Sequence, residues 1–209
     1  MKKILLMAGV AAFAFASNAN ALEVNPYVSA KLSYDWAKND VIHDSNYVSD
    51  KIKFHKNIWG GHYAAGVKAR AIRAEVEWNH YQDAKRKDFE ADMRFRLQNN
   101  TLMLNGYYDI NTCTKWTPYV GAGVGVAMLK FTAKDMGDGF KMNEKTYNVA
   151  WQVGAGVTYD LTKNVALDAG YRYIDAGAAV AQKVIDDGYE KVKADTAAHE
   201  VYFGARYTF

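Results

Sequence analysis

Three short stretches carry residue types that could do chemistry, and each lacks a part that the chemistry needs. "GAGVG" (Gly121–Gly125) has the glycines of a nucleotide-binding loop, but no helix follows it. His43-Asp44-Ser45 has the residue types of a hydrolase, but it falls in a long polar segment that would not fix its geometry. "KDMGDG" (Lys134–Gly139) has acids near glycines but lacks the full calcium-loop pattern. We therefore predict no catalytic site and no cofactor.

Histidine and cysteine give no stronger site. The five histidines show none of the spacings that bind metal, so no metal site is expected: His43, His55, His62, His80 and His199. Cys113 is the only cysteine, so it cannot form a disulfide within the chain. It lies in a predicted short turn, and we interpret it as incidental.

The other charged residues follow a pattern that does suggest a role. They occupy alternate positions of strand-like segments, with apolar residues between them, and both signs occur. These residues are Lys31, Asp35, Lys68, Arg73, Glu75, Glu77, Arg94, Arg96, Asp168, Arg172, Glu200 and Arg206. A buried charge requires a partner, so a shared interior would let these groups pair.

The chain begins like a secretory signal. Lys2 and Lys3 precede an apolar run, and Ala19 and Ala21 are small enough for cleavage before Leu22. The run is too short for a spanning helix, which needs about 20 apolar residues. We predict a signal peptide over residues 1–21 and one domain over residues 22–209. Cleavage lowers the formal net charge from +3 to +1, which gives no reason to expect nucleic acid.

Period-two alternation indicates eight strands. Their expected ranges are Pro26–Trp36, Ile58–Ala69, Ala71–Tyr81, Phe89–Ile110, Thr117–Phe131, Thr146–Asp160, Val165–Asp175 and Glu200–Phe209. In the fourth, the apolar set changes parity, which flips every side chain to the other face. We place a β-bulge at Gln98–Thr101, with a tight turn as the alternative.

The connections between these strands alternate in length. Long ones are expected at Ala37–Lys56, Gln82–Asp88, Thr132–Lys145 and Ala176–Thr196, and short ones at Ala69–Arg70, Asn111–Lys115 and "DLTKN" (Asp160–Asn164). Outer-membrane barrels have this asymmetry, with short periplasmic turns and longer outer loops. An even strand number puts both chain ends on the periplasmic side.

The composition of the two strand faces favours a membrane barrel over a soluble one. Glycines crowd the polar face, where they would leave room for large side chains inside a narrow barrel. Two aromatic bands, typical of membrane interfaces, are expected on the apolar face. One contains Tyr34, Trp36, Trp59, Trp78, Tyr147 and Tyr173, and the other contains Tyr108, Trp116, Tyr159, Tyr207 and Phe209.

Four motifs carry a family resemblance: "LMLNGYYDI", "TPYVGAGVGV", "GYRYIDAG" and the terminal "YFGARYTF". The mature chain resembles the OmpA/OmpX/opacity-protein-like superfamily, and more narrowly the surface-antigen and small porin-like outer-membrane proteins of Gram-negative bacteria. The resemblance implies an all-β, eight-stranded antiparallel up-and-down transmembrane barrel. It also implies a C-terminal signal for the barrel-assembly machinery at Tyr202, Gly204, Tyr207 and Phe209.

The expected function is therefore a structural and surface-interaction role in the bacterial outer membrane, antigen- or adhesin-like and without catalysis. A narrow porin-like channel for small solutes is the alternative, and a lipid A-modifying enzyme is a third and weaker one. Expected partners are outer-membrane lipid including lipopolysaccharide, the assembly machinery and an unknown extracellular or host-surface ligand. Lys85, Arg86 and Lys87 form a solvated loop tip or contact lipopolysaccharide phosphates.

Overall fold

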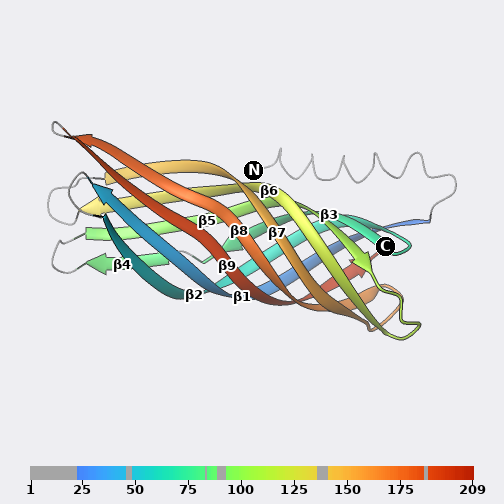
Figure 1. The fold of residues 1–209 in the computed structure, drawn as a ribbon. Coiled ribbons are helices and arrows are strands. Elements are labelled where there is room, and N and C mark those ends of the chain that lie inside the picture. Colours follow the sequence, from blue (N-terminus) through green and yellow to red (C-terminus); the bar gives the residue numbers. More distant parts are fainter. Residues whose placement is uncertain (1–22, 46–48, 83, 89–92, 136–140, 186–187) are drawn as a thin grey trace.

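The fold is known from a computed structural model that describes residues 23–45, 49–82, 84–88, 93–135, 141–185 and 188–209 (Figure 1). Side chains are described over residues 23–36, 58–82, 98–130, 145–177 and 196–209. The predicted signal peptide, with Ala19, Ala21 and Leu22, lies outside the described residues. Within them, no helix is long and apolar enough to cross a membrane.

Antiparallel strands close on themselves and form a barrel. They are β1 (Val24–Ser45), β2 (Ser49–Ala69), β3 (Ile72–Tyr81), β4 (Ala84–Asp88), β5 (Met93–Asp109), β6 (Trp116–Asp135), β7 (Lys141–Asp160), β8 (Val165–Ile185) and β9 (Gly188–Thr208). Strand β1 pairs with both β2 and β9, and β3 pairs with β5. Because β3 and β4 both pair with β5, they act as one strand, and the predicted eight-stranded barrel is confirmed.

The small number of strands makes this barrel narrow, and their stagger tilts them relative to the barrel axis. Following paired residues once around the barrel from Asp35 leads back to β1 at Asn25, ten residues away. Strand number, stagger and tilt are linked, and at eight strands the interior is just wide enough for side chains to fill it. We therefore expect side chains to fill the interior and leave no open channel.

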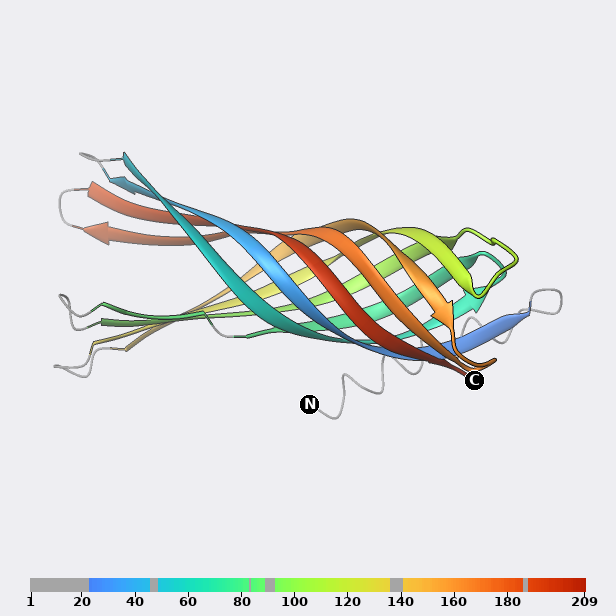
Figure 2. The ribbon, with the colours of Figure 1, turned by 90° about the horizontal axis from the view of Figure 1, so that it is seen from below.

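The strands project much farther from one end of the barrel than from the other (Figures 1 and 2). At the turn end lie the connections Arg70–Ala71, Ile110–Lys115 and Leu161–Asn164, together with the start of β1 and the end of β9. At the hairpin end the strands extend far past the waist of the barrel as paired arms. Local chemistry shapes the turns: Asn111 Oδ1 accepts the Cys113 N–H at 2.9 Å, and Thr162 Oγ1 accepts the Val165 N–H at 3.0 Å.

The two faces of each strand are inverted relative to those of a soluble barrel. Large apolar side chains point outward, and Leu32, Val124 and Phe203 are 68%, 60% and 58% exposed. Glu77 and Glu200, on the inner face, are 0% exposed. Apolar outside and polar inside is the arrangement of a transmembrane barrel.

Aromatic side chains gather in two bands around the outside. In the hairpin-side belt, Tyr34 contacts Trp36 and Trp59 with ring centroids 5.2 and 5.1 Å apart. In the turn-side belt, Trp116 packs on Tyr159 at 4.6 Å. These belts contain the residues expected from the sequence, at the two levels where amphipathic rings favour a membrane interface.

The four predicted long loops are wrong as loops, because strand pairing runs through most of each. Strand β1 continues to Ser45 and β2 begins at Ser49, so most of Ala37–Lys56 is a hairpin. The segments Gln82–Asp88, Thr132–Lys145 and Ala176–Thr196 likewise contain paired strand. The sequence signal was the end of apolar alternation, but an antiparallel ladder is made by backbone groups and does not need it.

The irregularity predicted at Gln98–Thr101 is also wrong in position. Strand β5 pairs with β6 without a shift along its whole length. On its other side, His80 pairs with Asn100 but Ala84 pairs with Leu97, so one extra residue lies between β3 and β4. A bulge belongs to a pair of strands, and sequence parity alone does not say which member holds the extra residue.

A second irregularity, which the sequence did not predict, lies between β8 and β9. The register between β8 and β9 shifts between Asp175 and Ala178. Gly177 adopts a φ of 74° there, a backbone conformation that favours glycine, and its N–H donates to Asp175 Oδ1 at 2.8 Å. This bulge lies on the hairpin side of Tyr173, a residue of the hairpin-side belt.

Candidate functional site: the charged interior and the projecting hairpins

The centre of the interior is an ionic cluster around Glu77 on β3. Lys31 Nζ lies 2.7 Å from Glu77 Oε2, and Arg172 Nη1 donates to Glu77 Oε1 at 2.5 Å. All three side chains are buried. The cations come from β1 and β8, so the cluster ties strands across the lumen rather than along one pair.

Glu75, the neighbouring inward-facing residue on β3, accepts from donors on two other strands, β1 and β5. Lys31 Nζ lies 3.0 Å from Glu75 Oε1, and the hydroxyls of Tyr27 and Tyr107 each donate to this carboxylate at 2.8 Å. Asn105 adds a longer bond at 3.4 Å. A carboxylate with this many donors is satisfied without water, as a buried charge requires.

Toward the hairpin end, Glu200 on β9 forms the next layer. Arg172 Nη2 lies 2.6 Å from Glu200 Oε1, which also lies 3.3 Å from His62 Nε2. Tyr81 donates to the other oxygen at 3.3 Å. Asp35 is the register partner of Glu200 on β1 and is also buried, so two carboxylates face one guanidinium in this layer.

Toward the turn end, two more carboxylates are paired. Asp109 accepts from Arg73 Nε at 2.8 Å and lies 2.9 Å from Lys68 Nζ. Asp168 accepts from Thr158 Oγ1 at 2.5 Å, and Arg206 Nη2 lies 3.8 Å from it. The layer nearest the turns therefore holds more cationic groups than carboxylates.

Tyrosines and small apolar residues fill the space that the charges leave. The hydroxyls of Tyr119 and Tyr202 are 2.9 Å apart, and a side chain at Gly156 or Gly170 would clash with these rings. Beyond Arg172, toward the hairpins, a buried apolar cluster lines the lumen on the adjacent strands β5 to β8. It consists of Met103, Ala127, Ala150 and Ala176. Over the described residues, the interior is thus packed by charged layers capped with an apolar one.

The residues that the sequence assigned to the interior fall into three groups. Nine are buried: Lys31, Asp35, Arg73, Glu75, Glu77, Asp168, Arg172, Glu200 and Arg206. The Lys68 side chain is 34% exposed, at the turn end. The side chains of Arg94 and Arg96 lie outside the described residues. Asp109 was missed, although it shares the parity of Asn105, so the period-two count could have found it.

Among the other sequence candidates, those with described side chains do not converge on a reactive centre, and the side chains of His43-Asp44-Ser45, His55 and Lys134–Gly139 lie outside the described residues. Gly121–Gly125 lies within β6, and Cys113 is exposed in the turn between β5 and β6. Among the described residues, no group of three or more His, Cys, Asp or Glu side chains could hold a metal ion. Of the proposed assembly signal, Tyr202 and Gly204 face inward, whereas Tyr207 and Phe209 are 47% and 67% exposed outside.

A closed barrel with a charged, packed interior and an apolar outer surface between two aromatic belts defines an integral β-barrel protein of the bacterial outer membrane. The chain belongs to the Opacity family porin protein family, whose model matches residues 65–209.

Individual relatives agree with this assignment. Over 126 residues the chain is 36% identical to the outer membrane protein PagN of Salmonella typhimurium, a match that covers 56% of this chain and 53% of PagN. A Rickettsia rickettsii protein with the word adhesin in its name is 29% identical over 89 residues, covering 42% of this chain and 40% of that protein. The chain thus spans about half or less of the length of these relatives.

Among solved structures, the fold resembles that of Neisserial surface protein A. The two share a TM-score of 0.58 and 22% identity, and the superposition covers 90% of this chain and 99% of that one. At this identity the likeness shows the fold alone.

Proposed function

We propose that this protein is a non-catalytic surface-interaction protein, in which the barrel is an anchor and the hairpins carry recognition. The observation that carries the proposal is the length of the strands. A tilted transmembrane strand needs about 9–11 residues, whereas β1 has 22 and β9 has 21. About half of each strand is therefore left to project from the membrane.

The belts indicate where that projection begins. Tyr207 of the turn-side belt pairs with Val28, and Trp36 on the same strand belongs to the hairpin-side belt. The hydrocarbon layer would thus span Val28–Trp36, and β1 runs on to Ser45. At about 3.3 Å per residue, this leaves roughly 30 Å of paired strand beyond the membrane interface. Rigid paired arms present side chains for recognition at a lower entropic cost than open loops would.

The name of one relative supports this role, since it contains the word adhesin. We further propose that the hairpin end faces outward and that both chain ends are periplasmic. Proteases added to whole cells should then cut within 37–56 or 176–196 and leave Leu161–Asn164 intact. Cleavage of that turn in intact cells would reverse the orientation.

We also propose two partners, outer-leaflet lipid and the barrel-assembly machinery. Lys85, Arg86 and Lys87 belong to β4 at the hairpin end, where outer-leaflet lipopolysaccharide phosphates would lie. We propose this contact, and we propose that the barrel-assembly machinery reads Tyr202, Gly204, Tyr207 and Phe209.

The surface role can be tested by shortening the hairpins. Residues 41–52 are replaced by Asn-Gly, which joins the pair Asp40 and Lys53 with a two-residue turn. The same replacement of residues 181–192 joins the pair Val180 and Lys193. Bacteria of a non-adherent laboratory strain that express the full protein should attach to cultured epithelial cells or matrix-coated wells. The doubly shortened variant should lose this attachment at equal surface level, and retained attachment would contradict the proposal.

A narrow channel remains the second candidate, because the family description contains the word porin. The packed charged layers argue against it, since ions would have to displace paired side chains. Planar-bilayer recordings of the purified protein separate the two. We expect no discrete openings, and regular ion-dependent steps would favour the channel.

A further inference from the structure

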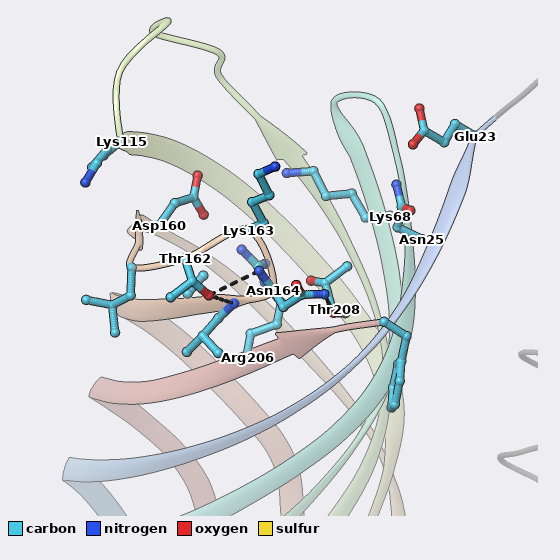
Figure 3. Close-up of a pocket in the computed structure, with 14 residues that line it drawn as sticks. Glu23, Asn25, Lys68, Lys115, Asp160, Thr162, Lys163, Asn164, Arg206 and Thr208 are labelled. Carbon is cyan, nitrogen blue, oxygen red and sulfur yellow. Dashed lines mark hydrogen bonds between the residues drawn. The ribbon is translucent and has the colours of Figure 1, made fainter.

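The turn end of the barrel contains a pocket that the surface role does not use. Its volume is about 660 Å³, and it lies between the start of β1, the β7–β8 turn and the end of β9 (Figure 3). In Figure 3, Lys68 and Lys163 extend toward one another across the opening. The size is within the range of small-molecule sites, about 300–1,000 Å³.

The lining of this pocket carries an excess of positive charge. Four basic residues contribute to it, Lys68, Lys115, Lys163 and Arg206, against two acids, Glu23 and Asp160. Within the described part of the chain, Lys115 and Lys163 form no ion pair. Their charges are therefore available to a molecule that enters from the turn end.

Two arginines below the pocket have N–H groups without acceptors. Arg206, only 4% exposed, lines the pocket, and its Nη1 has no acceptor among the described residues. Nη2 of the buried Arg73 is in the same state. Lys68 and Arg73 share the single carboxylate of Asp109. Buried guanidinium N–H groups without acceptors are rare in folded proteins, so these two donors are available to an anionic oxygen that reaches this end of the lumen.

We propose that the pocket at the turn end binds a small oxyanion, a carboxylate or a phosphate, held by Lys68 and Lys163 at its opening above the Arg206 guanidinium at its floor. Lysine supplies a mobile point charge at the entrance, whereas arginine holds a planar oxyanion by paired N–H donors. The Asn164 Nδ2 amide, which donates to Thr208 O at 2.7 Å, stiffens the turn that carries Lys163. The anion would supply the charge that Asp109 and Asp168 do not.

The test uses the full folded barrel in nanodiscs of phosphatidylcholine. Inorganic phosphate and, separately, succinate are titrated while backbone amide resonances are followed. We expect saturable shifts of the Lys163, Asn164 and Thr208 amides. Lys163→Gln should weaken the apparent affinity by about two- to fivefold, the factor typical of one exposed ion pair. The matched control Lys145→Gln removes the same charge from an exposed site far along β7 and should leave the affinity unchanged.

Two further measurements keep the proposal testable. Arg206→Lys keeps the charge but loses the planar donor pair, and it should also weaken binding in molecules that remain heat-modifiable on gels. Nanodiscs that contain phosphatidylglycerol, without added anion, distinguish the two sources of phosphate. Shifts of the same amides in these nanodiscs would show that the pocket binds a lipid headgroup. Their absence would show that the ligand is a free anion. The absence of saturable shifts with either titrant, or equal weakening by Lys145→Gln, would overturn the proposal.

Discussion

Neighbouring residues on one strand of this barrel face different surroundings, the packed interior and the outer surface. Lys31 is 8% exposed and contacts two carboxylates, whereas Leu32, the next residue, is 68% exposed on the outer face. The inner face depends on particular partners at particular distances. The outer face depends only on depth in the bilayer, because hydrocarbon has no preferred partner. One alternating pattern therefore encodes two kinds of stability, one specific and one generic.

The comparison predicts that damage to the inner face has the largest effect. Arg172→Ala removes the cation that contacts both Glu77 and Glu200 and leaves two buried carboxylates short of charge. The cost is expected to be about 3–5 kcal/mol, the usual effect of breaking a buried pair. Urea unfolding in detergent measures it, with Lys163→Ala at an exposed turn as the control, expected within about 0.5 kcal/mol. A small effect of Arg172→Ala would mean that water replaces the pairing.

A charge on the outer face is expected to have the next largest effect. Leu32 lies midway between Val28 and Trp36, so Leu32→Arg places a cation near the middle of the hydrocarbon at a cost of about 2–4 kcal/mol. Tyr147→Arg in the hairpin-side belt should cost only about 0–1 kcal/mol. Unfolding of both variants from lipid vesicles checks this. Equal costs at the two positions would mean that the cost of a charge on the outer face does not depend on its depth in the bilayer.

Loss of Phe209 should affect assembly more than stability. Burial of one Phe contributes about 1.5–3 kcal/mol, so the purified barrel should often survive its deletion. Insertion in cells should fall much further, because the proposed assembly signal loses its terminal aromatic. Outer-membrane levels of the deletion and of Phe209→Tyr, which keeps the ring, measure this. If the deletion variant reaches the outer membrane at the normal level, Phe209 contributes only to packing and is not part of an assembly signal.

Shortening the β1–β2 hairpin should change stability least. Residues 41–52 lie beyond Trp36, outside both the charged interior and the lipid-facing surface. Their replacement by Asn-Gly also removes the pairs between residues 41–45 and β9, but it leaves the membrane-spanning ladder intact, so it should lower the free energy of unfolding by less than Leu32→Arg does. The heat-modifiable fraction and the urea midpoint test this. A loss comparable to that of Arg172→Ala would show that the hairpins support the barrel.

Much of the interior could be predicted because strand periodicity is local. Glu75 and Glu77 share one parity of β3, and Ile72 and Trp78 share the other, so the face of each residue follows from counting. The partners could not be predicted in the same way. Arg172 and Glu77 are 95 residues apart in the chain, and only the stagger of the closed barrel brings them to 2.5 Å.

The sequence by itself determined the alternation, and with it the strand number, the inverted faces and the residues of both aromatic belts. Each of these depends on whether a single side chain favours hydrocarbon, the membrane interface or a polar interior. Only the tertiary structure decided how far the hairpins extend, which strand holds each bulge and which charges pair. Backbone ladders continue through polar residues such as Lys38 and Asn39, so side-chain type does not mark where a strand ends. A bulge such as that near Gly177, and the ion pairs across the lumen, are set by register between strands, a property that no single segment contains.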